Sequence, residues 1–184
     1  MSTAPSFKIL GYGHTGITVR SMSDSLRFWR DIIGLPIIWE QTVPGGVIPG
    51  DPTNTITGAP AGTTMHVTWL GLPQTPHAGG SGEPSHISTL ELIQYELPAD
   101  VAEEQKSRML NPRSWDVGAA HVNLIVQGLD EIVERVKAEG WNLYSGVFTV
   151  PQETPEVKAR GQRVCYLRGP DGEMVELTEI PKAL

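Results

Sequence analysis

Two histidines and two glutamates occupy corresponding places in the two halves of the chain. His14 and His121 each fall in the first predicted strand of their half, and Glu91 and Glu176 each fall in the last. Imidazole nitrogen and carboxylate oxygen suit borderline divalent ions, and the only thiol in the chain is Cys165. We therefore expect His14, Glu91, His121 and Glu176 to hold one Fe, Ni, Co, Mn or Zn ion, with open positions for water or substrate.

The alternation of strand side chains selects between neighbouring glutamates. Glu91 falls on the same face as Ile93, and Glu176 falls on the same face as Thr178. Glu179 lies an odd number of residues from Glu176 and therefore points the other way. A lone strand histidine is more often structural than a metal ligand, so the expectation rests on the paired placement.

The first half has a pattern that predicts a strand, a helix and three further strands. Ser23 is the expected helix cap and Gly34 its end. A stretch rich in Pro, Gly and Thr, at 44–62, has turn composition and is a candidate insertion or lid. The expected strands cover residues 8–20, 36–43, 63–71 and 86–97.

The second half repeats this order. His14 precedes the helix-ending Gly34 by 20 residues, and His121 precedes Gly140 by 19. The helix at 129–140 is followed by expected strands around 141–150, 163–168 and 173–180. We predict an α+β fold of two tandem βαβββ modules whose mixed sheets curl into a cup around the metal. The expected divisions are a first module at 8–98, a linker at 99–117 and a second module at 118–180.

Composition excludes several classes of function. The formal net charge is −7 and the chain has no run of Lys or Arg, which argues against nucleic-acid binding. No apolar run approaches the roughly 18 residues of a membrane span, and the N-terminal residues lack the parts of a secretory signal. With a single cysteine, expected at a packed strand position, a reducing cytoplasm is the expected location.

Several segments resemble one superfamily over nearly the whole chain. They are GHTGITV, SDSLRFWRDIIGLPI and LELI in the first half, and AHVNLIV, LDEIVERVKAEGW and YLRGPDGEMVEL in the second. This pattern is similar to the vicinal oxygen chelate superfamily, also called glyoxalase/bleomycin resistance/extradiol dioxygenase. The resemblance implies a metal-holding cup, a small substrate with two adjacent oxygens and a homodimer, with the cup within one chain or shared between two.

The resemblance implies a lyase, isomerase or epimerase that transfers a proton beside a metal-bound carbonyl. Glu176 or Glu91 is the expected base, and His66 a further candidate acid or base. Glutathione is disfavoured because Thr18 and Tyr95 stand where its recognition residues are usual. The candidate substrate-binding residues are Trp69, Tyr95, Trp115 and Asn123.

Two alternatives remain open from the sequence. An Fe(II) extradiol-type dioxygenase acting on an aromatic substrate would use His14, His121 and Glu176, with Glu91 occupying a face that oxygen needs. A drug-binding resistance protein would carry no metal and hold its ligand in an acidic groove. The complete His and Glu set favours an enzyme over such a binding protein.

Overall fold

The computed structural model describes residues 12–47, 50–73, 88–101, 111–151 and 161–181. Part of the expected linker, at 102–110, lies outside these ranges. Within them, no helix is long and apolar enough to cross a membrane.

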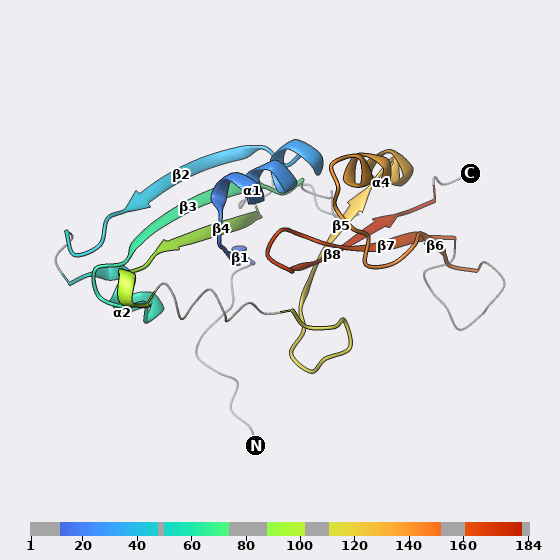
Figure 1. The fold of residues 1–184 in the computed structure, drawn as a ribbon. Coiled ribbons are helices and arrows are strands. Elements are labelled where there is room, and N and C mark those ends of the chain that lie inside the picture. Colours follow the sequence, from blue (N-terminus) through green and yellow to red (C-terminus); the bar gives the residue numbers. More distant parts are fainter. Residues whose placement is uncertain (1–11, 48–49, 74–87, 102–110, 152–160, 182–184) are drawn as a thin grey trace, which may run out of the picture.

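The chain forms two four-stranded mixed sheets with the same topology (Figure 1). In the first sheet the strand order is β1-β4-β3-β2, and in the second it is β5-β8-β7-β6. The first and last strands of each module pair in parallel, and the remaining neighbours are antiparallel. The predicted α+β fold of two βαβββ modules is thereby confirmed. The strands are β1 (His14–Val19), β2 (Ile37–Val43), β3 (Thr64–Gly71), β4 (Thr89–Glu96), β5 (His121–Val126), β6 (Phe148–Thr149), β7 (Arg163–Arg168) and β8 (Met174–Glu179).

The first helix begins earlier than expected. Helix α1 (Met22–Leu26) is capped by Ser21, whose hydroxyl accepts from the backbone N–H of Asp24 at 3.3 Å, so the prediction of Ser23 as cap was wrong. The N–H of Met22 donates to Gln94 of β4 at 2.6 Å, which ties the start of the helix to the sheet. The helix continues as the wider π-helix η1 (Arg27–Ile32).

The stretch expected to be an irregular insertion contains a short helix. Helix α2 (Pro52–Thr57) is capped by Asp51, whose side chain accepts from the N–H of Asn54 at 3.3 Å. Gly58, in the left-handed region at φ 73°, ends the helix, since a residue with a Cβ would be strained there. Capping chemistry thus organises a segment that has little apolar period.

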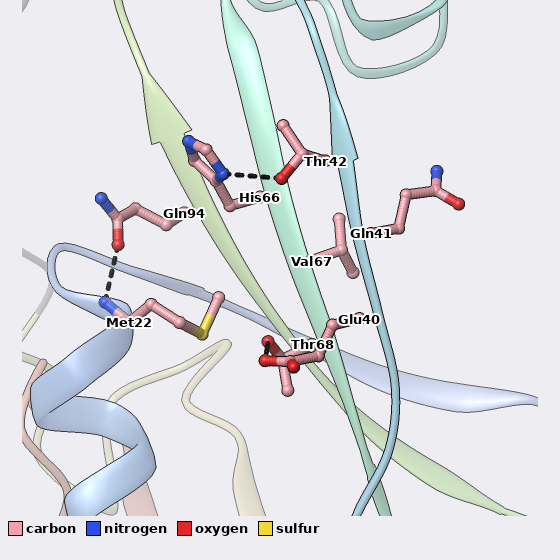
Figure 2. Close-up of a pocket in the computed structure, with 8 residues that line it drawn as sticks. All are labelled: Met22, Glu40, Gln41, Thr42, His66, Val67, Thr68 and Gln94. Atoms are coloured by element: carbon pink, nitrogen blue, oxygen red, sulfur yellow. Dashed lines mark hydrogen bonds between the residues drawn. The ribbon is translucent and has the colours of Figure 1, made fainter.

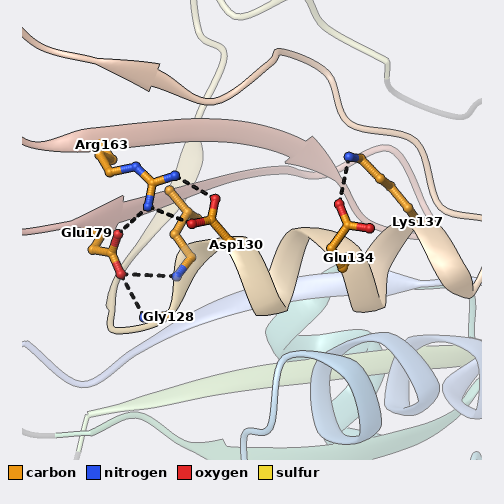
Figure 3. Close-up of polar contacts among 7 residues, drawn as sticks. Gly128, Asp130, Glu134, Lys137, Arg163 and Glu179 are labelled. Atoms are coloured by element: carbon orange, nitrogen blue, oxygen red, sulfur yellow. Dashed lines mark hydrogen bonds and ion pairs between the residues drawn. The ribbon is translucent and has the colours of Figure 1, made fainter.

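Helix α4 (Leu129–Ala138) begins at a cap that comes from a distant strand. Glu179 of β8 accepts from the backbone N–H groups of Gly128 at 2.7 Å and Leu129 at 3.1 Å (Figure 3). Arg163 of β7 joins this carboxylate to Asp130 in the first turn. These contacts lower the pKa of Glu179, chiefly through the hydrogen bond from Leu129. Glu179 therefore has a structural role, in accordance with the choice of Glu176 as candidate ligand.

Both modules bury one face of their sheet in a single shared core. Phe28 and Trp29 of η1 are fully buried, and the ring of Phe28 meets that of Trp141 of the second module at 5.5 Å. Arg20 at the end of β1 donates through Nε to Asp171 at 2.7 Å, and Trp29 Nε1 donates to Glu173 at 3.2 Å. Core side chains from both modules include Val19, Leu70, Leu90, Leu92, Leu129, Val133, Cys165, Leu167, Val175 and Leu177. Helices α1 and α4 accordingly lie on the same side of the molecule (Figure 1).

Candidate functional site

The first His and Glu pair is formed by the parallel strands β1 and β4. His14 Nε2 lies 3.2 Å from Glu91 Oε2, and the imidazole is about half exposed while the carboxylate is mostly covered. Gly16 pairs with Glu91 across the strands. A Cβ on Gly16 would lie 3.3 Å from Glu91 Oε2, so the lack of a side chain leaves room for the carboxylate.

The second pair has the same construction. His121 of β5 places Nε2 3.0 Å from Oε2 of Glu176 of β8, with similar exposure of both side chains. Asn123 pairs with Glu176 as Gly16 does with Glu91, and its amide donates to Thr178 Oγ1 at 2.9 Å. The predicted candidate Asn123 therefore lies beside the second pair.

Both pairs lie on the sheet faces turned away from the shared core. In β4, Leu90 and Leu92 are buried in that core, so Glu91 between them points to the opposite face. In β5, Val122 and Leu124 pack toward the core while His121 is exposed. The structure thus presents two half-open pairs, one on each sheet.

The four expected ligands come together as two pairs and not as one set within this chain. Across the ranges that the structure describes, no three His, Cys, Asp or Glu side chains are grouped closely enough to hold a metal ion. The donor chemistry of each pair, one imidazole nitrogen and one carboxylate oxygen, fits half of a divalent site.

An aromatic pair lies beside the first His and Glu pair. Trp69 of β3 stands directly across from Glu91, and Trp39 of β2 stands directly across from Trp69. The two indoles are stacked, with ring centroids 4.4 Å apart and planes 19° apart. Trp69 was a sequence candidate, whereas Trp39 was not. This alignment continues the register of the rest of β2 with β3, and the irregularity lies beyond it, between Ile37 and Trp39. The sequence alone does not specify that register.

Tyr166 of β7 is the counterpart of Trp69 in the second module. It stands across from Glu176, and its ring meets that of His121 edge-on at 5.7 Å. Burial and the nearby charge of Glu176 raise the pKa of the Tyr166 hydroxyl, so it remains protonated at neutral pH. Sequence reasoning missed this residue, although its place across from Glu176 follows once the two modules are aligned.

His66 lies on the other face of the first sheet. It pairs with Gln94 and is therefore on the same face as the core residues of β4, away from Glu91. Its Nδ1 is 3.1 Å from Thr42 Oγ1 and its Nε2 is 3.4 Å from Glu96 Oε2. Figure 2 shows it in a separate pocket of about 410 Å³. The structure does not bring His66 to either pair.

The other two substrate-binding candidates have different surroundings. Tyr95 lies on the same face of β4 as Glu91, four residues further along the strand. Trp115 is 69% exposed in a turn, where the guanidinium of Arg113 stacks 5.2 Å from the centre of its ring. Of the aromatic candidates, Trp69 is the one that stands directly across from a member of a pair.

Solved structures with the same fold include a glyoxalase family protein from Bacillus cereus, with a TM-score of 0.68, 21% identity and coverage of 96% of this chain and 98% of that one. A glyoxalase/dioxygenase from Nostoc punctiforme matches with a TM-score of 0.54, 21% identity and coverage of 99% of both chains. The fosfomycin resistance protein FosX from Listeria monocytogenes, in complex with Mn(II) and sulfate, matches with a TM-score of 0.50, 18% identity and coverage of 95% of both.

No curated protein matches the sequence. The family model of the Glyoxalase/Bleomycin resistance protein/Dioxygenase superfamily matches residues 11–177, which is most of the chain and includes both His and Glu pairs. The chain therefore belongs to the glyoxalase/bleomycin resistance protein/dioxygenase superfamily.

Proposed function

We propose that this protein is a divalent-metal-dependent enzyme that transfers a proton at a carbon beside a carbonyl group. We further propose that each site joins the His14 and Glu91 pair of one copy to the His121 and Glu176 pair of a second copy. The observation that carries this proposal is the presence of two matched pairs, on exposed faces, in a chain whose described residues assemble no larger set.

A two-fold symmetric dimer would give each pair its complement. In such a dimer one contact is repeated by symmetry, so two equivalent sites form, each with two imidazoles and two carboxylates. The binding of Mn(II) by FosX, which has the same fold, supports a divalent ion in this setting. Both pairs are exposed enough to be reached by a second chain.

The residues around the pairs suit proton transfer. A bound divalent ion would act as a Lewis acid toward the substrate carbonyl. Glu176 or Glu91 takes up the proton from carbon, as a positioned carboxylate general base. Tyr166 stands across from Glu176 and is protonated at neutral pH, so its hydroxyl can donate a hydrogen bond to an oxygen that gains negative charge.

The first test is the metal content of protein purified without oxygen and without an affinity tag. We expect a near-stoichiometric divalent ion by elemental analysis, and its loss in H14A and H121A. The stripped protein is then loaded with each metal and given acetoin in D₂O, where exchange of the carbon-bound hydrogen next to the carbonyl is followed by NMR. Manganese, nickel, cobalt or zinc restoring exchange supports the proposal.

Other outcomes point to the alternative activities. If iron alone restores a reaction and that reaction is oxygen uptake with catechol, the dioxygenase alternative replaces proton transfer. If the protein contains no metal as purified and binds none when it is added, the proposal of a metal-dependent enzyme is wrong. The alternative of a metal-free binding protein then remains.

Mixing two inactive variants tests the shared site directly. H14A and H121A are unfolded and refolded together in equal amounts. In a mixed dimer, one site would carry both substitutions and the other would be native, so about one quarter of the native metal sites should return. If the ligands of each site came from one chain, the mixture would stay as empty as the separate variants.

A further inference from the structure

A row of four residues runs across the first sheet on the face that carries His14 and Glu91. It crosses β1, β4, β3 and β2 in the order Gly16, Glu91, Trp69, Trp39. Neighbouring strands are about 4.8 Å apart, so the two indoles begin one strand away from the carboxylate and extend the row by about 10 Å. Gly16, at the other end of the row, has no side chain that projects from the sheet beside Glu91.

The exposure of this aromatic pair is unusual for a packing role. Trp39 is 55% exposed, although a large apolar side chain contributes most when it is covered. Its described ring contact is the stacking on Trp69. By contrast, Phe28 meets both Trp29 and Trp141 edge-on in the shared core. Trp39, stacked on the partly buried Trp69, therefore offers an apolar surface that a ligand at Glu91 can cover.

The chemistry of the row defines the ligand that fits it. Glu91 and the adjacent His14 supply the polar end, and the remaining members of the row are two indoles and a glycine. The row contains no Lys or Arg, so it offers no partner for a phosphate or carboxylate on the ligand. Indole surfaces favour flat, unsaturated rings because such rings stack or pack edge-on against them.

We propose that the Trp39 and Trp69 pair binds a planar, unsaturated ring of the substrate, while two adjacent oxygens on that ring or beside it reach the His14 and Glu91 pair. This inference rests on the proposed function for the placement of the oxygens. The adjacent oxygens are what the superfamily resemblance implies, and the new assignment is the flat ring and the two indoles that bind it.

The test compares two probes that differ in the ring alone. Catechol and cis-1,2-cyclohexanediol both carry adjacent oxygens on a six-membered ring, but only catechol is flat and unsaturated. Their affinities are measured by isothermal titration calorimetry on the full chain, as purified and after removal of metal with a chelator. The stripped sample is needed because catechol also binds metal ions better than the diol does.

The variants are chosen to separate a flat ring from apolar bulk. W39L should lower the preference for catechol over the diol about three- to tenfold, in both the metal-containing and the stripped protein. W39F keeps a flat ring and should retain most of the preference. W115L is the matched control, because Trp115, an exposed tryptophan that was also a substrate-binding candidate from the sequence, packs against Arg113 in a turn and is not part of the row. It should leave the preference unchanged.

The inference is overturned if catechol gives no binding at millimolar concentration, if W39L changes the preference by less than about twofold, or if W115L lowers it as much. Metal analysis of the same samples keeps this result apart from the proposed function. If the protein contains no metal but W39L still lowers the preference for catechol, the proposed metal site is wrong and the proposed ring site stands. If H14A loses the metal but W39L leaves the preference unchanged, the proposed metal site stands and the proposed ring site is wrong.

Discussion

Gly16 determines how closely the Glu91 carboxylate can approach the first strand. In G16A the new methyl group would lie 3.3 Å from Glu91 Oε2 and 3.7 Å from the Ile93 side chain. We expect the carboxylate to shift and metal affinity to fall about tenfold, as for other changes that reorient a ligand. The free energy of unfolding should change by less than about 1 kcal/mol, because no buried group is removed. Metal titration and urea unfolding measure the two effects.

The control for this substitution lies nearby in the sequence. A Cβ on Gly13 would meet no atom within 4 Å, so G13A should leave metal affinity unchanged. Equal losses of affinity in G13A and G16A would show that chain stiffness, and not contact with Glu91, is responsible.

The alternation of strand residues accounts for what could be predicted at the residue scale. It separated Glu176 from Glu179 and turned Glu91 away from the core face of its sheet. The His and Glu contacts also need the parallel pairing of β1 with β4 and of β5 with β8. Trp39 could not be found this way, because alternation within one strand does not specify which residue of β3 stands across from it. His66 was a candidate by residue type alone, and the strand register places it on the opposite face.

At the scale of elements, the cap of α4 joins a helix to the last strand. The pKa of Glu179 is lowered in the folded protein, chiefly by the Leu129 N–H. This contribution to stability is present above the unfolded carboxyl pKa and is lost as pH falls through the lower folded value. E179Q should therefore lower the free energy of unfolding at pH 7 by about 1 kcal/mol, with a smaller loss under acid conditions. Urea denaturation from pH 7 down to pH 3 measures both.

Glu134 on the same helix provides the comparison. It pairs with Lys137 at 3.0 Å on the surface and is mostly exposed (Figure 3). E134Q should change stability by less than about 0.5 kcal/mol at any of these pH values. A loss in E134Q as large as that in E179Q would indicate a general charge effect on the helix.

Element positions were predictable where local pattern decides them. The helix at 129–138 and most strands of both sheets follow from period and turn residues. The strand expected at 141–150 is the exception, because only Phe148–Thr149 forms a strand there. The start of α1 was misplaced because Met22 is fixed by a bond to Gln94, which is 72 residues away in the sequence. Helix α2 was missed because it depends on capping by Asp51 more than on an apolar face.

At the scale of the whole molecule, the shared core couples the two modules. Phe28 is fully buried against Trp29 and Trp141, so F28A should destabilise the protein by about 3 to 5 kcal/mol. Both modules should unfold in one transition, because the cavity lies in the core that they have in common. Urea unfolding followed by tryptophan fluorescence and by circular dichroism should give coincident curves.

Phe148 offers a matched control in the second module. Its side chain is 61% exposed, so F148A should cost less than about 1 kcal/mol. Two separate transitions in the native protein or in F28A would contradict a common core.

Local patterns could not predict how the two modules dock. Each pair forms within its own sheet, and the modules join through their helices, through Arg20 with Asp171, and through Trp29 with Glu173. These are contacts between side chains more than 140 residues apart in the sequence. The sequence therefore indicated the four candidate ligands but not their division into two separate pairs.

The separation of the two pairs has a genetic consequence if sites form between chains. A variant chain that has lost His14 would still fold and would still associate with native chains. Each mixed assembly would then keep one working site and lose the other, so activity in the cell would fall only in proportion to gene dosage. An allele lacking both pairs would disable both sites of every native partner that it captures, and activity in the cell would fall by more than the loss of gene dosage.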